Sequence, residues 1–205
     1  MAHLDWERSC WQDGYQFVAG VDEAGRGALA GPVCAAAVVL PCDAELPDVA
    51  LLINDSKQLS ERKRTEMAEI VRDIALCWGV AYVDAHVIDE IGISRANRLA
   101  MEMAVALLTF QPDIVLLDAL TCDIGAPQIG LIDGDAISLS IAAASILAKT
   151  ERDLLMRNHH RIDHRYHFDR HVGYGTTLHL AALREHGPSA MHRKTFRGVL
   201  SGPGE

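Results

Sequence analysis

The stretch FVAGVDEAGRGALAGPV, Phe17–Val33, contains the features that decide the fold. Its apolar beginning, Phe17–Val21, is typical of a buried strand, and the glycine-rich segment Gly25–Gly31 is typical of a turn. A second short apolar run, Val33–Leu40, follows directly. Two apolar runs joined by a glycine turn predict a pair of hairpin strands early in the chain.

Outside this hairpin, strand and helix patterns alternate. Ser60 is a typical helix cap and predicts a helix over 61–74. Apolar residues at helical spacing predict a second helix over Ser94–Phe110, which Pro112 would end. The other expected elements are strands at Leu76–Val83, Ile114–Leu117 and Gln128–Ile132, and helices at Leu139–Met156, Thr177–His186 and Ser189–Val199. Hairpin strands followed by β-α-β units indicate an α/β fold with a mixed five-stranded sheet flanked by helices.

The composition is that of a globular protein. Hydrophobic residues make up 49% of the 205 residues, which is enough to bury a core. No apolar run reaches the roughly 18 residues that span a bilayer, so no membrane association is expected. We expect a core over residues 1–156 and a small C-terminal helical segment over 157–205, packed together as one monomeric unit.

The cysteines and the N-terminus predict a cytoplasmic protein. Five cysteines are scattered without a C-x-x-C pair, which argues against a disulfide framework or a zinc ribbon. The first twenty residues include Asp5, Glu7 and Asp13 and do not resemble a secretion signal.

Charge is distributed unevenly along the chain. The net charge is −9, but residues 1–148 carry −13 and residues 149–205 carry +4, together with eight of the ten histidines. An acidic first part could hold metal ions, and a basic second part could hold phosphates. Asymmetry of this size is also common on solvated surfaces, so the charge pattern leaves both interpretations open.

Four carboxylates lie at or near the ends of predicted strands: Asp22, Glu23, Asp118 and Asp135. Such carboxylates lose solvation, and side by side they would repel one another. A hard divalent cation such as Mg²⁺ or Mn²⁺ offsets both costs. Plainer interpretations exist for each position: Asp135 could cap a helix, Asp118 could start a loop, and the Asp-Glu pair could lie on the surface.

The glycine turn is similar to a nucleotide-binding loop but does not match one. Gly25, Gly27 and Gly31 give G-x-G-x-x-x-G instead of G-x-G-x-x-G, and the chain has no G-x-x-x-x-G-K-[ST]. This spacing argues against a dinucleotide-dependent oxidoreductase. A glycine turn with Arg26 does suit close approach to a nucleic-acid backbone, because main-chain N–H groups and a guanidinium can both donate to it.

These residues and several further segments resemble the ribonuclease HII family. The matching segments are VDEAGRG at 21–27, NDSKQLS at 54–60, LLDA at 116–119, GDAISLSIAAASILAK at 134–149, HVGYGT at 171–176 and HRKTF at 192–196. The resemblance covers nearly the whole chain. It implies a ribonuclease H-like fold and a metal-dependent endonuclease that cuts RNA joined to or paired with DNA.

The resemblance also implies roles for particular residues. Four would be catalytic ligands of two Mn²⁺ or Mg²⁺ ions: Asp22, Glu23, Asp118 and Asp135. Six would bind substrate: Gly25, Arg26, Gly27, Lys57, Lys149 and Tyr174. Among these six, the turn would recognise the RNA–DNA junction, the tyrosine would pack on the sugar after the ribonucleotide, and the lysines would contact phosphates. Without the resemblance, the tyrosine is interpreted as a packing residue and the lysine at 149 as a solvated helix residue.

Three positions depart from lysines that are common in the family: Gln58, Asp133 and Val172. Each departure removes positive charge near the expected substrate path, so we expect weaker binding with a shallower salt dependence. The segment 159–171 contains pairs of histidines at helical i,i+4 spacing. Zinc needs three or four convergent ligands, so a polar loop near the substrate is the favoured interpretation.

The chemistry implied by the resemblance is two-metal hydrolysis of a phosphodiester. The cut would lie on the 5′ side of a ribonucleotide and leave a 3′-hydroxyl and a 5′-phosphate, as removal of misincorporated ribonucleotides and RNA primers requires. The sister type, ribonuclease HIII, carries an extra N-terminal domain, for which no space is expected before Phe17. An inactive hybrid-binding module is the other alternative, and the presence of all four carboxylates argues against it.

Overall fold

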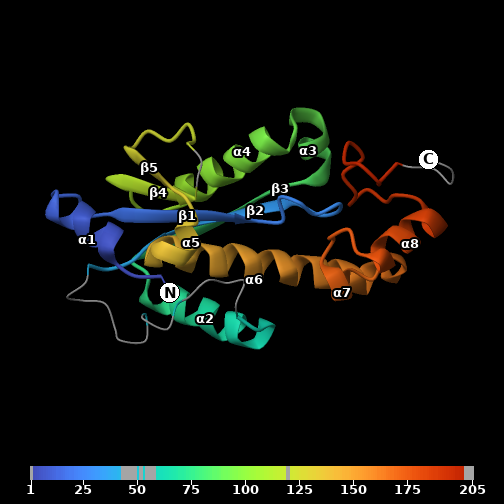
Figure 1. Cartoon of the computed structure of the whole chain (residues 1–205), viewed down its shortest axis with the longest axis horizontal. Coiled ribbons are helices and arrows are strands. Elements are labelled where there is room, and N and C mark those ends of the chain that lie inside the picture. The colour runs from blue at the N-terminus through green and yellow to red at the C-terminus, as the bar shows by residue number, and fades with distance from the viewer. Residues whose placement is uncertain (1, 43–49, 51–52, 54–58, 119–120, 201–205) are drawn as a thin grey trace.

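The computed structural model describes residues 2–42, 50, 53, 59–118 and 121–200. A five-stranded sheet in the order β3-β2-β1-β4-β5 lies at its centre (Figure 1). The strands are β1 (Val18–Ala24), β2 (Val33–Val39), β3 (Cys77–Val83), β4 (Ile114–Asp118) and β5 (Gln128–Leu131). β1 to β3 are antiparallel neighbours, whereas β4 runs parallel to β1 and β5 parallel to β4. The expected mixed five-stranded sheet is confirmed.

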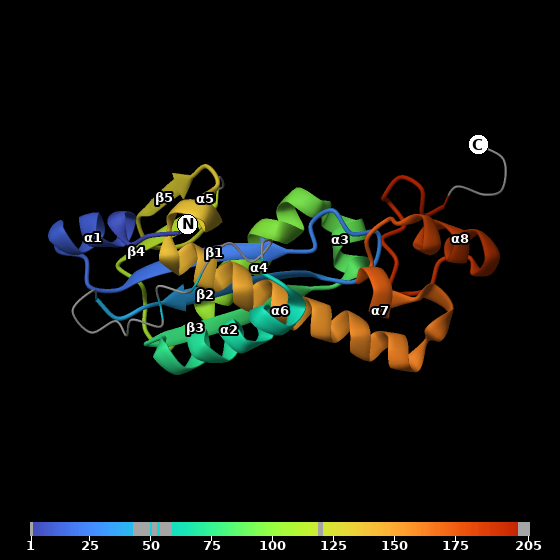
Figure 2. The same ribbon diagram turned by 60° about the horizontal axis from the view of Figure 1, so that its bottom comes forward.

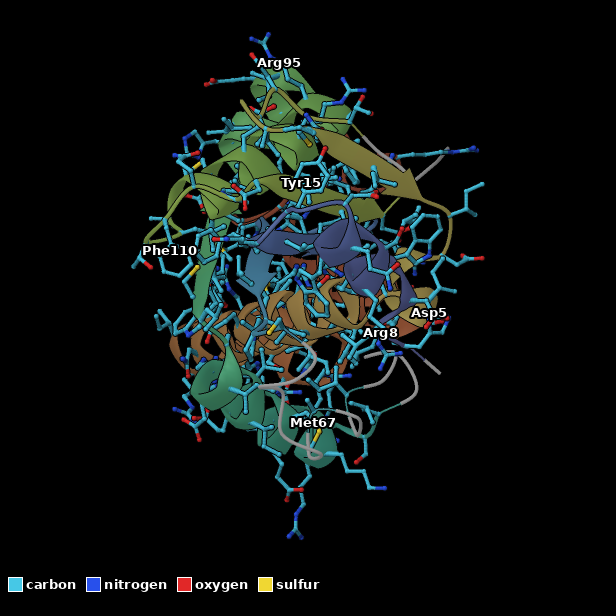
Figure 3. The ribbon with its side chains drawn as sticks, turned by 90° about the vertical axis from the view of Figure 1, so that its left-hand side faces the viewer. Asp5, Arg8, Tyr15, Met67, Arg95 and Phe110 are labelled. Carbon is cyan, nitrogen blue, oxygen red and sulfur yellow. The ribbon has the colours of Figure 1, made fainter. Side chains whose placement is uncertain are left out.

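Helices cover both faces of this sheet. Helices α3 (Ala85–Ile91) and α4 (Ile93–Ala106) lie on one face, and α2 (Glu61–Ile74) and α6 (Leu139–Ile162) lie on the other (Figures 1 and 2). Figure 3 shows Arg95 of α4 and Met67 of α2 on opposite sides of the molecule. The shorter elements are α1 (Asp5–Gln12), α5 (Gly134–Ile137), a 3-10 turn (His164–Tyr166), α7 (Phe168–His171) and α8 (Thr177–His186). In the part of the chain that the structure describes, none of the helices is long and apolar enough to cross a membrane.

Helix α6 packs its backbone directly on β1. A Cβ added at Gly20 of β1 would lie 2.1 Å from the carbonyl carbon of Ser140 in α6, so a larger residue does not fit there. Ser138 caps α6 by accepting a hydrogen bond from the N–H of Ile141. The buried carboxylate of Glu7 in α1 accepts hydrogen bonds from the hydroxyl groups of Ser138 and Ser140. These contacts fix the start of α6 against the centre of the sheet.

Most elements lie where the sequence predicts them. The helix over 61–74 with its Ser60 cap and the helix Thr177–His186 are confirmed. Strand β1 continues three residues past its predicted end, α4 ends at Ala106, and α6 continues six residues past Met156. Helices α1 and α3 are not predicted by the patterns in the sequence.

Two expectations about the C-terminal part are wrong. The stretch Ser189–Val199 is not helical; it forms turns and one bridge between His192 and Ala30. Its Arg193 side chain is buried and donates to main-chain carbonyl groups, which a solvated helix would not allow. The polar loop expected over 159–171 is instead the end of α6, the 3-10 turn and α7.

Candidate active site

Three of the four predicted carboxylates lie at one edge of the sheet. Strands β1 and β4 are parallel neighbours, and the pairing of Val21 with Leu117 places Asp22 and Asp118 at adjoining positions. Glu23 follows on β1, which continues to Ala24, so both acidic residues of β1 lie inside the strand. Topology therefore brings these three carboxylates together from segments that are nearly a hundred residues apart.

Burial and mutual repulsion act on these carboxylates. The Asp22 side chain is almost inaccessible, and its burial raises its pKa well above the usual range. The charges of Glu23 and Asp118 raise this pKa further, while a hydrogen bond with Ser145 lowers it. Burial also raises the pKa of Glu23, against a lowering effect of Asn97. Negative charges close together and away from water favour a compensating cation.

Asp135 approaches the same edge through α5. The N–H of Gly134 donates to Oδ1 of Asp118 at 3.0 Å, and Asp135, next in the chain, is buried. Asp133 occupies the cap position of α5, so Asp135 lies inside the helix and does not cap it.

The donor chemistry of this edge fits a hard divalent cation. Among the described residues, no three Asp, Glu, His or Cys side chains converge closely enough to form a finished metal cage. The residues at the edge are nevertheless carboxylates, the ligands that Mg²⁺ and Mn²⁺ prefer. Burial and the charge of Glu23 raise the pKa of Asp22 more than the hydrogen bonds from Ser145 and the Glu23 N–H lower it.

A buried arginine holds the glycine turn that follows β1. Gly25 has a φ of +86°, a conformation that suits glycine. Arg193 is fully buried and donates to three carbonyl oxygens of the turn, those of Gly25 (2.8 Å), Arg26 (2.9 Å) and Gly31 (3.0 Å). Arg26 and Gly27 themselves are exposed, and Nη1 of Arg26 lies 3.9 Å from Oε1 of Glu23.

A second buried arginine joins this turn to the loop that carries Tyr174. Arg152 of α6 donates to three carbonyl oxygens, those of Pro32 (2.9 Å), Ala30 (3.0 Å) and Val172 (2.9 Å). The carbonyl of Gly173 in the same loop accepts from the N–H of Leu29 at 2.9 Å. The turn and the loop therefore form one hydrogen-bonded unit.

Most of the predicted substrate-binding residues lie together around this unit. Tyr174 is half-buried, and Nζ of Lys149 lies 5.6 Å from its ring centroid. Nζ of Lys149 also pairs with Oδ1 of Asp153 at 2.6 Å. Lys57 lies outside the described residues.

Two of the three departures from the common lysines have unusual backbone conformations. Asp133 has a φ of 54° and Val172 a φ of 43°. A positive φ is strained for a β-branched residue, so the Val172 loop is held in place by its surroundings. Gln58 lies outside the described residues.

A series of hydrogen bonds runs from Ser189 through His192 and His179 to the main chain of Tyr174. The N–H of Ser189 donates to Nδ1 of His192 at 3.0 Å, which assigns the His192 proton to Nε2. Nε2 of His192 then donates to Nε2 of His179, and the two nitrogen atoms are 3.0 Å apart. Since Nε2 of His179 accepts, Nδ1 of His179 carries the other proton and donates to the carbonyl oxygen of Tyr174 at 3.0 Å. This arrangement requires both rings to be neutral.

The buried histidines predict an acid-sensitive fold. Burial, and next the neighbouring His179, lower the pKa of His171 and His192 to about 4. In the unfolded chain these groups take up protons near pH 6.5, so stability is complete above that pH and falls as the pH is lowered toward 4. Each contributes at most about 1.4 kcal/mol per pH unit in this window.

Urea unfolding at several pH values between 7 and 4 checks this expectation. His192→Gln should flatten the pH dependence of the unfolding free energy, whereas the exposed His86→Gln should leave it unchanged. An identical slope for His192→Gln and the wild type would contradict it.

Sequence reasoning missed several residues that support the site. Arg193 belongs to the segment HRKTF, and the resemblance to the family implies no role for this arginine. Arg152, Asn97 and Ser145 lie in helical patterns where nothing in the sequence distinguishes them from solvated or packing residues. Their importance follows only from their burial against the turn and the carboxylates.

Comparison with known proteins decides the family. The family model for ribonuclease HII matches residues 19–199. This chain belongs to the ribonuclease HII family. Ribonuclease HII of Halalkalibacterium halodurans is 47% identical over 96% of this chain and 73% of its own length. Ribonuclease HII of Geotalea uraniireducens is 49% identical over 96% of this chain and 89% of its own length.

Solved structures agree with the fold. The crystal structure of ribonuclease H2 from Pyrococcus horikoshii superposes with a TM-score of 0.76 at 24% identity, covering 89% of this chain and 95% of that one. The expected ribonuclease H-like fold is confirmed. As a member of the ribonuclease HII family, the protein is a divalent-metal-dependent endoribonuclease that removes RNA from RNA–DNA hybrids.

Proposed function

We propose that four carboxylates hold two divalent cations, Mg²⁺ or Mn²⁺, at the edge of the sheet: Asp22, Glu23, Asp118 and Asp135. The observation that carries this assignment is the buried, mutually repelling cluster at the ends of β1 and β4. When bound, the cations supply an activated water and compensate the charge on the leaving 3′ oxygen. The carboxylates bind and space the cations, and Gly134 orients Asp118 through its N–H.

We assign recognition of the ribonucleotide to the unit formed by the glycine turn and the Tyr174 loop. Exposed Gly27 and Arg26 offer donors to a 2′-hydroxyl and to phosphate. The Tyr174 ring offers an apolar face to the next sugar, and Lys149 offers a positive charge to a phosphate. The substrates include duplex DNA with embedded ribonucleotides, cut on the 5′ side of the ribonucleotide to leave a 3′-hydroxyl and a 5′-phosphate.

The proposal divides the chain into two parts, and both of them contribute residues to substrate binding. Residues 1–156 form the catalytic core, and residues 157–205 form a substrate-binding segment packed on it. Arg193 supports the packing of the second part on the first, because it donates to main-chain carbonyls of the glycine turn. The free thiols of the five cysteines fit a reducing compartment such as the cytoplasm.

The proposal is tested with a labelled DNA duplex that contains one ribonucleotide. The protein is incubated with this duplex in Mg²⁺, Mn²⁺ or EDTA. We expect a single cut 5′ to the ribonucleotide with either metal and no cut in EDTA. Cleavage of a long RNA–DNA hybrid without this cut would remove the recognition roles of Arg26 and Tyr174. Failure on both substrates with both metals would instead indicate an inactive hybrid-binding module.

Tyr174→Ala should discriminate between the two substrates. An embedded ribonucleotide offers one junction, so loss of the ring should lower its cleavage rate more than that of a long hybrid, which offers many contacts. Stacking contacts of this kind contribute about 1–3 kcal/mol, or roughly 5- to 150-fold. Rates on both substrates, compared with those of Tyr174→Phe, provide the measurement. Equal losses on the two substrates would argue against junction recognition by Tyr174.

A further inference from the structure

The two acidic residues of β1 point to opposite faces of the sheet, because side chains alternate along a strand. Asp22 faces α6, where it meets Ser145. Glu23 faces α4, where it meets Asn97. A cation shared by both carboxylates therefore needs each one turned toward the sheet edge, and a neighbouring polar group on each face can do this.

Asn97 is an unusual residue for its place in α4. Its side chain is fully buried, and neither its amide nitrogen nor its amide oxygen meets hydrogen-bond geometry with any described residue. The other residues that α4 buries are all apolar: Ala96, Ala100, Met101, Ala104 and Val105. A buried amide without a partner costs about 1–3 kcal/mol, and packing alone does not account for it.

The neighbour of this amide is Glu23. The amide is near enough to favour the ionised carboxylate, although the pair stops short of hydrogen-bond geometry. Glu23 is only partly exposed, and besides Asn97 the exposed Arg26 lies near it, with Nη1 at 3.9 Å from Oε1 of Glu23. A hydrogen bond from the amide N–H to one carboxylate oxygen would leave the other oxygen for a cation.

We propose that Asn97 is a positioning residue that turns the Glu23 carboxylate toward the divalent cation. The inference rests on the proposed function, in which Glu23 is a metal ligand. Asn97 acts through Glu23 and does not touch the substrate. Groups that orient metal ligands typically change metal affinity or activity about 10- to 100-fold when they are removed.

Asn97→Leu is the variant that tests this role, because it keeps the shape and removes the amide. We expect Mn²⁺ affinity, measured by calorimetry without substrate, and kcat to fall about 10- to 100-fold, while KM for a hybrid stays unchanged. The melting temperature should stay equal or rise, since an unpaired buried polar group is replaced by an apolar one. A merely structural residue would give the reverse: a lower melting temperature with normal Mn²⁺ affinity and kcat.

Met101→Leu is the matched control, since Met101 is buried on the same helix and the change conserves volume. It should keep Mn²⁺ affinity, kcat and KM. If Asn97→Leu does not fold, Asn97→Ala places the same small residue there as at Ala96 and Ala100, and the same loss of Mn²⁺ affinity is expected.

Glu23→Gln in the same calorimetric measurement tests the metal-ligand role of Glu23 separately from the positioning role of Asn97. Normal Mn²⁺ affinity of Glu23→Gln would overturn the proposed metal ligand itself. Weak affinity of Glu23→Gln together with normal affinity of Asn97→Leu would overturn only the role of Asn97. The double variant should bind Mn²⁺ no more weakly than Glu23→Gln alone, because Asn97 acts through that carboxylate.

Discussion

Asp118→Asn is expected to abolish cleavage while leaving hybrid binding intact. The change removes one negative charge where β4 adjoins β1. The proposed cations would then lose a ligand that Asp22 and Glu23 cannot replace. The amide is nearly the same size, and its oxygen can still accept the N–H of Gly134. Removing one electrostatic contribution to a transition state costs about 10²–10³-fold in rate, and a lost metal ligand should cost at least that.

Single-turnover cleavage and a filter-binding or anisotropy titration measure the two quantities separately. Asp123→Asn is the matched control, because Asp123 is an exposed carboxylate in the segment after β4. It should cleave at the wild-type rate. Near-normal turnover by Asp118→Asn would remove Asp118 from the mechanism.

Arg193→Met should have the largest effect on stability. The methionine can fill much of the space, but it removes the guanidinium donor from the turn carbonyls of Gly25, Arg26 and Gly31. Gly25 keeps the N–H of Ala28 as a donor, whereas the carbonyls of Arg26 and Gly31 lose theirs. Each buried acceptor left unpaired costs about 1–3 kcal/mol, so we expect a loss of about 3 kcal/mol or more in unfolding free energy. For a chain of this size that corresponds to a fall of about 6 °C or more in melting temperature.

Thermal unfolding followed by circular dichroism gives this value directly. Lys194→Met, at the exposed neighbouring position, should leave the melting temperature unchanged. Folded Arg193→Met protein should also lose more activity on a single embedded ribonucleotide than on a long hybrid, because the turn is no longer fixed. A melting temperature equal to that of the wild type would contradict the assigned support of the turn.

The elements of the fold follow from local patterns in the sequence. Alternation and apolar runs predict the five strands, and Ser60 and Thr177–His186 give helix bounds that the structure confirms. The pattern over Ser189–Val199 misleads, because helical spacing cannot show that Arg193 is drawn inward to main-chain carbonyls far along the chain. Long-range hydrogen bonds of this kind leave no periodic trace.

The candidate site likewise has residues that the sequence pattern reveals and residues that it does not. The carboxylates are conspicuous in the sequence because acidic residues follow apolar runs, and the strand order then makes Asp22 and Asp118 neighbours. The residues that support the carboxylates and the glycine turn are not conspicuous. Asn97 and Arg152 lie within helices and look like surface residues until their burial is known.

Helix α6 connects the proposed metal site with the proposed recognition unit. On this helix Ser145, which meets Asp22, and Arg152 lie seven residues apart, which at 1.5 Å per residue is about 10 Å. Its first turn packs on β1 beside the carboxylates, and Arg152 further along holds the loop of Tyr174. In this proposal the helix therefore fixes the distance between the recognised sugar and the broken bond. The products from a given junction should have one length, without the ladder of neighbouring lengths that a sliding cut would produce.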